Sequence, residues 1–366
     1  MGSTPSTTKH GHLDRSGVLW LTSDIWKPVG DAIYHQPAGR THPGSVWAAL
    51  HKSTPTRLPR VIKVGGRDAR GDTFVYNRLV AASKDHPECA DLFPSVPTHV
   101  RFHGSRLATG DHSHWNYVVL ERCVCTLADV CRSGRHFTNR EICTIALRMV
   151  RALRHLHTVA GVLHTDVAPS NIFIRGGLDE DIGSVDVGGV VLADFGHYIL
   201  CTESGEGDFP SGAGRLPFQP AVHHEGKNAC ASCDLEQLAY VLMMVSAAGT
   251  ALPWHSSMAS WELADRKRRV CVACPDGSAH WLAEFAHICQ TATQSAGTPA
   301  PYDALLRLVE SHTDEVDHGV GESGLSVTVE VEGAGCGRCA GRGGCCVVHH
   351  GIEHSVLQQA EGSFGK

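Results

Sequence analysis

Apolar residues recur at helical spacing in the middle of the chain. They follow Thr138 three or four positions apart and would share one helix face: Ile142, Ile145, Ala146, Met149, Val150, Leu153 and Leu156. Thr138 and Glu141 have the spacing of a capping box, in which each side chain accepts from the other residue's backbone N–H. The pattern therefore predicts a helix that begins behind Thr138 and buries this face.

A second apolar run, residues 238–254, is nearly long enough to be compared with a membrane span. It lacks flanking anchors and contains Gly249 and Pro253, so we interpret it as a buried helix and expect no transmembrane segment. Shorter apolar runs predict strands, and one amphipathic stretch predicts a helix. The strands are expected at residues 60–64, 117–123, 172–174 and 190–192, and the helix at residues 72–83. The apolar stretch at residues 18–26 is expected to begin the folded part of the chain.

Residues 175–189 connect two of these predicted strands and carry four acidic residues, Asp179, Glu180, Asp181 and Asp186. The twelve-residue ligand pattern of a calcium loop is absent. The sequence therefore predicts a solvated hairpin insertion rather than a calcium site.

Composition indicates which partners and which cellular compartment to expect. The chain has 366 residues and a formal net charge of −6, which gives no reason to expect nucleic acid as a partner. Fifteen cysteines are spread through predicted core elements with no signal peptide ahead of them, which favours reduced thiols in an intracellular protein, cytoplasmic or nuclear. The pairs Cys230/Cys233 and Cys271/Cys274 have C-x-x-C spacing, and we interpret both as packed thiols. Residues 1–6 match the minimal myristoylation pattern, which arises easily by chance.

The candidate chemistry is concentrated in residues 164–196. Asp166 lies five residues before Asn171, and Asp194 follows the predicted strand at 190–192. Phosphoryl transfer needs a carboxylate that accepts the proton of the attacking hydroxyl, and oxygen ligands that hold Mg²⁺ against the nucleotide phosphates. Two Asp residues and an Asn at these positions suit that reaction.

This stretch resembles the catalytic loop and the DFG motif of the protein kinase superfamily. The resemblance implies an α+β, two-lobed protein kinase fold, with a small antiparallel β lobe carrying one helix and a large, mainly helical lobe. It also implies ATP as the phosphate donor, with Mg²⁺ or Mn²⁺ as the metal. Asp166 would be the catalytic base, and Asn171 and Asp194 the metal ligands.

Three further stretches resemble the nucleotide-binding parts of the family. Gly39, Gly44 and Val46 match positions of the Gly-rich loop, although Thr41 replaces its middle glycine. Lys63 resembles the lysine that pairs with the α- and β-phosphates, and Asp72 is the acid best placed on the next helix to partner it.

Residues 117–123 resemble the strand that runs into the hinge. Leu120 would then be the gatekeeper, and the backbone of Glu121 to Cys123 would bind the adenine edge.

Residues 233–242, with the motif D-L-E-x-L-x-Y-x-L, and the later L-P-W at 252–254 resemble the casein kinase 1 family and its relatives, which are serine/threonine kinases. In that family Asp234 would hold the catalytic-loop backbone by hydrogen bonds. The implied organisation is a disordered tail at 1–16, a small lobe at 17–121, a large lobe at 122–315 and a Gly/Cys/His-rich tail at 316–366.

Several family positions are substituted. Thr165 replaces the Arg that reads an activation-segment phosphate, and Ala168 replaces the Lys that steadies the γ-phosphate. Arg215 stands where a Thr usually contacts that Lys, so we hypothesise that Arg215 supplies the missing cation and count it with Asp166 as catalytic. The A-P-E acid is also absent, because residues 220–222 read Pro-Ala-Val.

The leading interpretation is an active, monomeric protein kinase that phosphorylates Ser or Thr of protein substrates. A pseudokinase scaffold that binds ATP and partner proteins without efficient transfer is the alternative, and it draws on Thr41, Ala168 and the use of Asp72 in place of a Glu. A small-molecule phosphotransferase of the aminoglycoside kinase type shares a similar loop, but it would not explain the motifs at 233–242 and 252–254. The tail offers ligands for a structural Zn²⁺, with low-complexity sequence as the simpler interpretation: Cys336, Cys339, Cys345, Cys346, His349 and His350.

Overall fold

A computed structural model describes a large part of the chain. The described residues are 12–13, 19–20, 26–35, 45–51, 60–65, 67–96, 105–106, 114–177, 180–201, 206–207, 214–247, 252–254, 258–273, 280–294, 298–313 and 328–331. They form two compact units, each of which is described by itself below. Unit 1 comprises Met1–Cys123 and Ala193–Tyr198, and unit 2 comprises Val124–Leu192 and Ile199–Lys366. The short segment Ala193–Tyr198 thus packs with unit 1, although the sequence assignment placed it in the large lobe.

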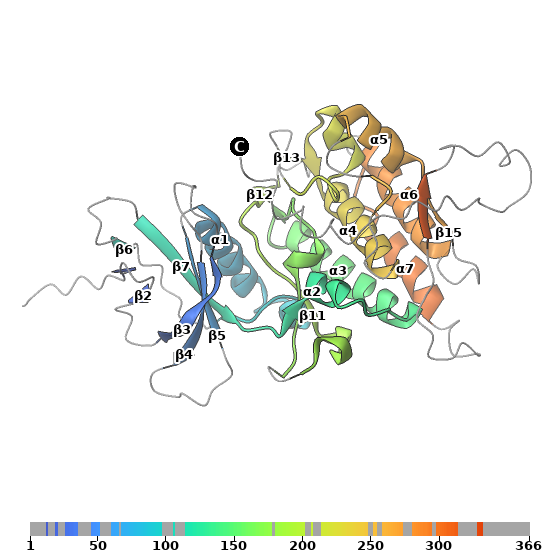
Figure 1. Ribbon diagram of the computed structural model, residues 1–366. Helices are drawn as coiled ribbons and strands as arrows, with labels where there is room; N and C mark the ends of the chain where they lie inside the picture. Colours follow the sequence, from blue (N-terminus) through green and yellow to red (C-terminus); the bar gives the residue numbers. More distant parts are fainter. Residues whose placement is uncertain are drawn as a thin grey trace, which may run out of the picture. The chain divides into compact units, whose positions relative to one another are not determined.

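Unit 1 is built on an antiparallel sheet with one long helix beside it (Figure 1). The strand order is β3 (Trp26–His35), β4 (Ser45–His51), β5 (Arg60–Gly65), β7 (His114–Glu121) and β6 (Ser105–Arg106). Two short strands, β1 (His12–Leu13) and β2 (Leu19–Trp20), form a separate pair, and a 3-10 helix η1 covers Pro87–Leu92. The strands expected at 60–64 and 117–123 correspond to β5 and β7.

The helix of unit 1, α1 (Arg67–Ala82), packs on β5 and β7 and begins five residues before the predicted start. Its buried face includes Val75, Tyr76 and Leu79. The sheet contributes Trp47, Ile62 and Val119, which are at most 1 % exposed. These side chains make the small core that fixes the position of β5 and α1.

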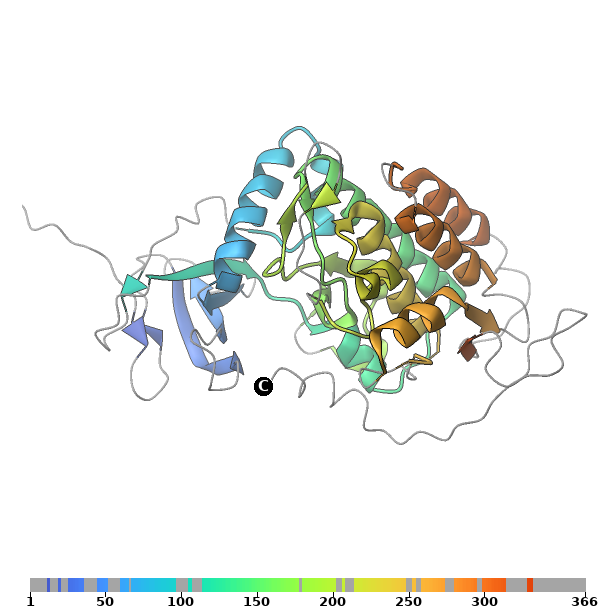
Figure 2. The ribbon, with the colours of Figure 1, turned by 90° about the horizontal axis from the view of Figure 1, so that it is seen from above.

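Unit 2 is mainly helical (Figures 1 and 2). Its helices are α2 (Leu127–Arg132), α3 (Asn139–Thr158), α4 (Ala231–Ser246), α5 (Ser260–Arg268), α6 (His280–Gln294) and α7 (Tyr302–Thr313). Short strands pair as β8 (Cys125–Thr126) with β10 (Ile172–Ile174), β10 with β11 (Val190–Leu192), β9 (Val162–Leu163) with β12 (Ile199–Leu200), β13 (Glu206–Gly207) with β14 (Ala229–Cys230), and β15 (Val270–Ala273) with β16 (Thr328–Val331). The 3-10 helices are η2 (Pro169–Asn171), η3 (Ile182–Ser184), η4 (Val187–Gly189) and η5 (Ala221–Glu225).

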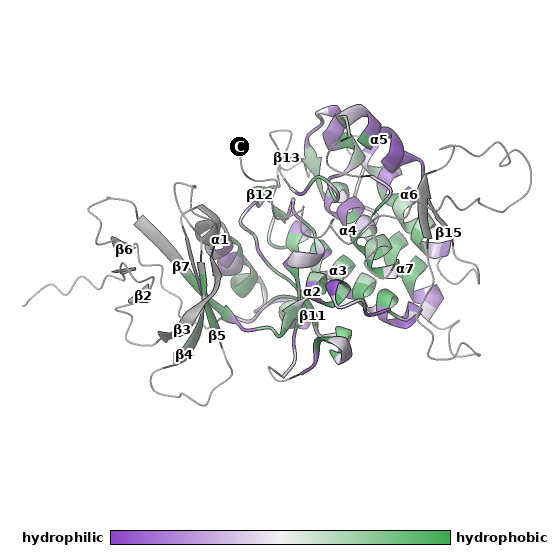
Figure 3. Ribbon diagram, in the orientation of Figure 1, coloured by the Kyte–Doolittle hydropathy of each residue, from purple (hydrophilic) through white to green (hydrophobic). Residues whose placement is uncertain are grey.

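The predicted amphipathic helix is α3, and its capping box is present in both directions. All seven of its predicted face residues are fully buried. The prediction of a buried helix is confirmed for residues 238–246 of the second apolar run, because they lie in α4, which is buried along almost its whole length and contacts α3 and α6. Residues 248–251 of the run lie outside the described residues. By contrast, Figure 3 shows α5 as mostly hydrophilic. Within the part of the chain that the structure describes, no helix is long and apolar enough to cross a membrane.

The insertion at 175–189 is a hairpin, since β10 and β11 pair in antiparallel register on either side of it. The expectation that it is solvated was only partly right. Val185 and Val187 are at most 3 % exposed, and the Arg135 guanidinium donates to the Val185 carbonyl at 2.6 Å. Contact between α3 and η4 explains this burial.

Candidate functional site

Unit 1 gathers two carboxylates around a single lysine. Lys63 lies on β5, and its Nζ is 2.6 Å from Asp72 Oδ2 on α1 and 2.5 Å from Asp194 Oδ1. Asp72 was the acid expected from the sequence to partner Lys63, but the contact with Asp194 was not anticipated. Among the residues that the structure describes, this cluster holds one lysine and two carboxylates.

Burial and the charges of the cluster shift its pKa values. Burial lowers the pKa of Lys63, but the charges of Asp194 and Asp72 more than offset this, so that the pKa lies well above its ordinary value. Burial and the charge of Asp194 raise the pKa of Asp72, which Lys63 offsets only in part. The Asp194 side chain is 41 % exposed and therefore accessible to a ligand.

The segment that carries Asp194 is fixed to α1 by several contacts. The Phe195 N–H donates to Asp72 Oδ1 at 2.6 Å, and its ring meets Tyr76 edge-on at 5.1 Å between centroids. A Cβ on Gly71 would lie 2.8 Å from the Phe195 carbonyl oxygen, so the close approach requires glycine there. Asp194 itself adopts a left-handed backbone with φ of 65°. These contacts determine where the Asp194 carboxylate points.

The other predicted nucleotide-binding residues of unit 1 lie on its strands or outside the described residues. Val46 on β4 is paired with Lys63 in the sheet register. Leu120 is buried on β7, and Glu121 ends that strand, with its N–H donating to Ser95 O. Cys123 is half-buried. Gly39 and Gly44 lie outside the described residues, so the Gly-rich loop stays a prediction.

In unit 2, Asp166 is surrounded by donors from its own loop and from residue 215. Asn171 Nδ2 donates to Asp166 O at 2.8 Å and to Oδ2 at 3.0 Å. The Arg215 N–H donates to Oδ1 at 3.2 Å, and Arg215 Nε lies 3.8 Å from Oδ2. The structure thus brings together Asp166, Asn171 and Arg215, three of the predicted site residues, around one carboxylate.

Asp234, in the first turn of α4, holds the loop from beneath. Its carboxylate accepts from the N–H groups of His164 at 2.6 Å and Thr165 at 2.8 Å, as the family resemblance implied. His157 Nε2 lies 2.8 Å from the same carboxylate. Gln237, one turn along α4, accepts from the Val167 N–H and donates to Thr165 O. Residues 164–167 are therefore anchored to one buried helix.

The hydrogen bonds to α4 hold Thr165 in an unfavourable backbone conformation. Thr165 is β-branched yet has φ of 66°, in the left-handed region. Gly214 approaches it so closely that a Cβ on residue 214 would lie 2.7 Å from the Thr165 carbonyl oxygen. Gln219 Nε2 donates to Gly214 O at 3.0 Å and fixes this approach. The Gly214 backbone leads directly to Arg215, which explains how Arg215 reaches Asp166.

Residues 216–221 are held by two buried charged residues that sequence reasoning missed. Lys267 on α5 is fully buried, and its Nζ contacts Leu216 O at 2.9 Å, Gln219 O at 2.5 Å and His224 Nε2 at 3.0 Å. Glu236 on α4 accepts from the Ala221 N–H at 2.8 Å. Burial lowers the pKa of Lys267 to about 7. The Nζ of Lys267 thus has three hydrogen-bond contacts, two with carbonyl oxygens and one with the imidazole of His224.

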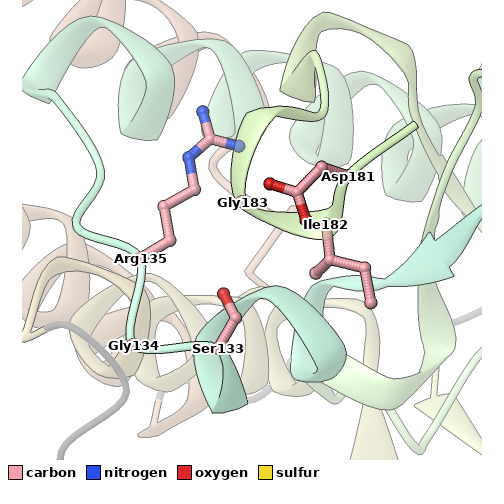
Figure 4. Close-up of a pocket in the computed structure, with 6 residues that line it drawn as sticks. All are labelled: Ser133, Gly134, Arg135, Asp181, Ile182 and Gly183. Carbon is pink, nitrogen blue, oxygen red and sulfur yellow. The ribbon is translucent and has the colours of Figure 1, made fainter.

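A separate hollow in unit 2 is lined by Ser133, Gly134, Arg135, Asp181, Ile182 and Gly183 (Figure 4). Its one cation, Arg135, is already paired with Glu141 and with the Val185 carbonyl. None of the predicted site residues lines it. We therefore do not treat this hollow as a candidate site.

This chain is similar in sequence to the protein kinase domain and in structure to a solved kinase. Residues 100–219 match the model of the protein kinase domain. A solved structure described as vaccinia related kinase 3 is similar, with 20 % sequence identity and a TM-score of 0.58 over 85 % of this chain and 91 % of that one. No curated protein matches the sequence. The chain therefore has the α+β protein kinase fold, with a small antiparallel sheet unit and a larger helical unit, and the expected fold class is confirmed.

Proposed function

We propose that the protein is an ATP-dependent protein kinase that transfers the γ-phosphate of ATP to Ser or Thr of protein substrates. The observation that carries the proposal is the cluster of Lys63 with Asp72 and Asp194. A lysine held by an acid from the neighbouring helix is prepared to contact nucleotide phosphates. A scaffold that binds ATP without transfer would also use the lysine and the two acids, but it would have no use for Asp166 as a base.

Each residue has a role in this proposal. Asp166 accepts the proton of the attacking hydroxyl, and Asn171 Nδ2 orients its carboxylate. Lys63 binds phosphate oxygens of ATP. The backbone of Glu121 to Cys123 binds the adenine edge behind Leu120, and the loop around Gly39, Gly44 and Val46 covers the phosphates.

The metal assignment rests on donor chemistry. Mg²⁺ prefers oxygen ligands, and Asp194 in unit 1 and Asn171 in unit 2 each offer one. The Asp194 carboxylate is 41 % exposed, and its oxygens are of the kind that a divalent cation prefers. When bound, the metal neutralises charge on the β- and γ-phosphates. Mn²⁺ has the same ligand preference and would be an alternative.

Serine/threonine specificity and kinship with casein kinase 1 relatives are supported by the α4 motif. Asp234 and Gln237 anchor residues 164–167, and Glu236 anchors Ala221, so that helix α4 organises the catalytic loop and the end of the activation segment. The motif resembles that of kinases whose substrates are proteins.

The experiment is ³²P transfer from ATP and Mg²⁺ to casein and to myelin basic protein, with Asp166→Ala as the matched variant. Transfer by the wild type that is lost in Asp166→Ala supports the proposal. If the wild type transfers no phosphate to either protein while ATP still raises its melting temperature, the scaffold alternative replaces the kinase proposal.

The role of Arg215 is tested separately. Its contacts with Asp166 support the hypothesis that it supplies the cation missing at Ala168. Arg215→Ala should lower kcat by tens of fold or more, which corresponds to about 2 kcal/mol of transition-state stabilisation. Adding Ala168→Lys to that variant should restore part of the loss. Unchanged turnover in Arg215→Ala would end the hypothesis.

A further inference from the structure

Two cysteines stand together at the start of α4. Cys230 is the residue before the helix, and Cys233 lies in its first turn. Their sulfur atoms are 3.3 Å apart, and no disulfide joins them. A disulfide needs about 2.05 Å between the sulfurs, so closure requires the atoms to approach by only ~1 Å. The sequence interpretation of packed thiols fits Cys233, which is 1 % exposed, but not Cys230, which is half-buried and reachable from solvent.

The surroundings make these two thiols chemically different from each other. The hydrogen bond from the Cys233 thiol, together with the backbone amides of Cys233 and Ser232, holds the pKa of Cys230 below its ordinary value against the effect of burial. The same thiol–thiol hydrogen bond and burial raise the pKa of Cys233 well above its ordinary value. An outer thiol with a lowered pKa at a helix N-terminus, beside an inner thiol, is the arrangement in which C-x-x-C pairs react.

Three other cysteines that the structure describes in unit 2 differ from Cys230. Burial raises the pKa of Cys125 to about 11 and those of Cys131 and Cys143 to about 12. These thiols remain protonated near neutral pH and are inert as nucleophiles. Cys230 therefore differs from them in both accessibility and acidity.

We propose that Cys230 and Cys233 form a thiol–disulfide redox site that reacts with low-molecular-weight disulfides of the glutathione type. The Cys230 thiolate attacks one sulfur of the disulfide, whose S–S bond breaks and releases one thiolate. Cys233 then loses its proton to solvent and attacks the Cys230 sulfur, which forms the Cys230–Cys233 bond and releases the second thiolate. Two protein thiols are oxidised, and one small disulfide is reduced to two thiols.

The Cys230–Cys233 pair lies beside the residue that anchors residues 164–167, so its oxidation can affect that loop. Asp234 directly follows Cys233 and accepts from the N–H groups of His164 and Thr165. Cys230 also belongs to β14, which pairs with β13 in residues 206–207. A disulfide across the first turn of α4 would therefore lie next to Asp234, the residue that anchors the loop of Asp166.

The test uses the full chain, reduced and then equilibrated with glutathione buffers of increasing oxidised fraction. Free thiols are blocked with N-ethylmaleimide, and peptides are mapped by mass spectrometry, a readout independent of any kinase activity. We expect a Cys230–Cys233 bridge whose fraction follows a two-electron titration curve. Complete alkylation of both cysteines at every buffer composition would overturn the proposal.

Three variants assign the steps. Cys233→Ser should stop at a mixed disulfide between Cys230 and glutathione, whereas Cys230→Ser should carry no glutathione on Cys233. Cys89→Ser is the control, because Cys89 is half-buried and burial raises its pKa, and it should leave the bridge unchanged. Melting curves of the Ser variants establish that they fold. Equal glutathione labelling of Cys230 and Cys89, or protection from alkylation that a chelator removes, would also overturn the proposal.

Discussion

Asp72 in unit 1 and Asp234 in unit 2 are both at most 1 % exposed, yet their environments differ in one respect. Asp234 has donors to itself: the N–H groups of His164 and Thr165, and His157 Nε2. Burial would raise its pKa, but the hydrogen bond and charges of His157 and His164 more than offset this and place the pKa below its ordinary value. Asp72 shares Lys63 with Asp194, and its pKa is raised.

The difference separates structural from functional carboxylates. A buried carboxylate whose lone pairs are all satisfied by fixed donors has no capacity left for a ligand, and its removal affects folding. A buried carboxylate whose pKa is raised, beside a lysine and a second acid, is a candidate functional group. The two acids should therefore respond to the same substitution in different ways.

The largest stability effect is expected for Asp234→Asn. The amide keeps one acceptor and turns its NH₂ group toward at least one buried donor, so either the Thr165 hydrogen bond or those of His164 and His157 are lost together with the charge. We expect a loss of about 3–5 kcal/mol in the free energy of unfolding, measured in urea. Asp303→Asn is the matched control, because Asp303 pairs with Arg154 at an exposed site and should cost less than about 1 kcal/mol. A similar, small loss in both variants would remove the structural role of Asp234.

Asp72→Asn should show the opposite balance. The Asn oxygen can still accept from the Phe195 N–H, so the stability cost should be near 1 kcal/mol. Lys63 loses one of its two anions, and phosphoryl transfer should fall by about 10–100-fold. Urea unfolding and ³²P transfer are measured on the same preparation. If Asp72→Asn lost as much stability as Asp234→Asn, the distinction between the two acids would be wrong.

Lys267 is the basic counterpart of these two buried acids, and its nearest contacts are carbonyls and an imidazole rather than a carboxylate. Its pKa is about 7 in the folded chain and 10.5 in its ordinary state, so between these values the unfolded chain binds more protons. Stability should therefore rise with pH from about 7, with a slope of at most ~1.4 kcal/mol per pH unit from this group.

The measurement is the melting temperature between pH 7 and 8.5 for the wild type and Lys267→Met. The variant should lack most of the rise, whereas Lys227→Met, at a half-exposed position, should keep it. Parallel curves for wild type and Lys267→Met would show that Lys267 does not titrate in this range.

The smallest stability effect is expected at Gly214, which packs against Thr165, one of the residues whose N–H donates to Asp234. Gly214 and Gly134 both have positive φ, 83° and 77°, but only at Gly214 would a Cβ meet a neighbour, the Thr165 carbonyl. Gly134→Ala measures the backbone cost alone, and Gly214→Ala should exceed it by about 1 kcal/mol in urea unfolding. Equal losses would mean that the approach of residue 214 to Thr165 has no energetic weight.

Sequence patterns predicted the helices whose buried residues recur at regular spacing. The α3 face and the α4 core follow directly from the spacing of apolar residues, because these helices pack on other helices of unit 2. The start of α1 was predicted five residues too late. Gly71, just ahead of the predicted start, has weak helix propensity, but the helix extends through it to Arg67, and the close approach of Gly71 to the Phe195 carbonyl needs the small residue there.

The candidate site was predictable only where family motifs mark it. Asp166, Asn171 and Asp194 stand in such motifs, whereas the contact of Asp194 with Lys63 depends on the fold of the segment 193–198. Lys267 lies in the basic run at 266–269, which by composition reads as a solvent-exposed surface. No local pattern distinguishes the one lysine that turns inward, because its partners come from residues some fifty positions earlier.

The return of the chain to unit 1 at Ala193–Tyr198 also sets an order for synthesis. When Cys123 leaves the ribosome, Lys63 and Asp72 are already made, but Asp194 is not, and all of Val124–Leu192 must be translated first. At typical elongation rates this interval lasts several seconds, far longer than helix or hairpin formation. The nascent sheet unit therefore waits without Phe195 against Tyr76 and without the second acid on Lys63, and a fragment that ends at Cys123 would remain in that unfinished state.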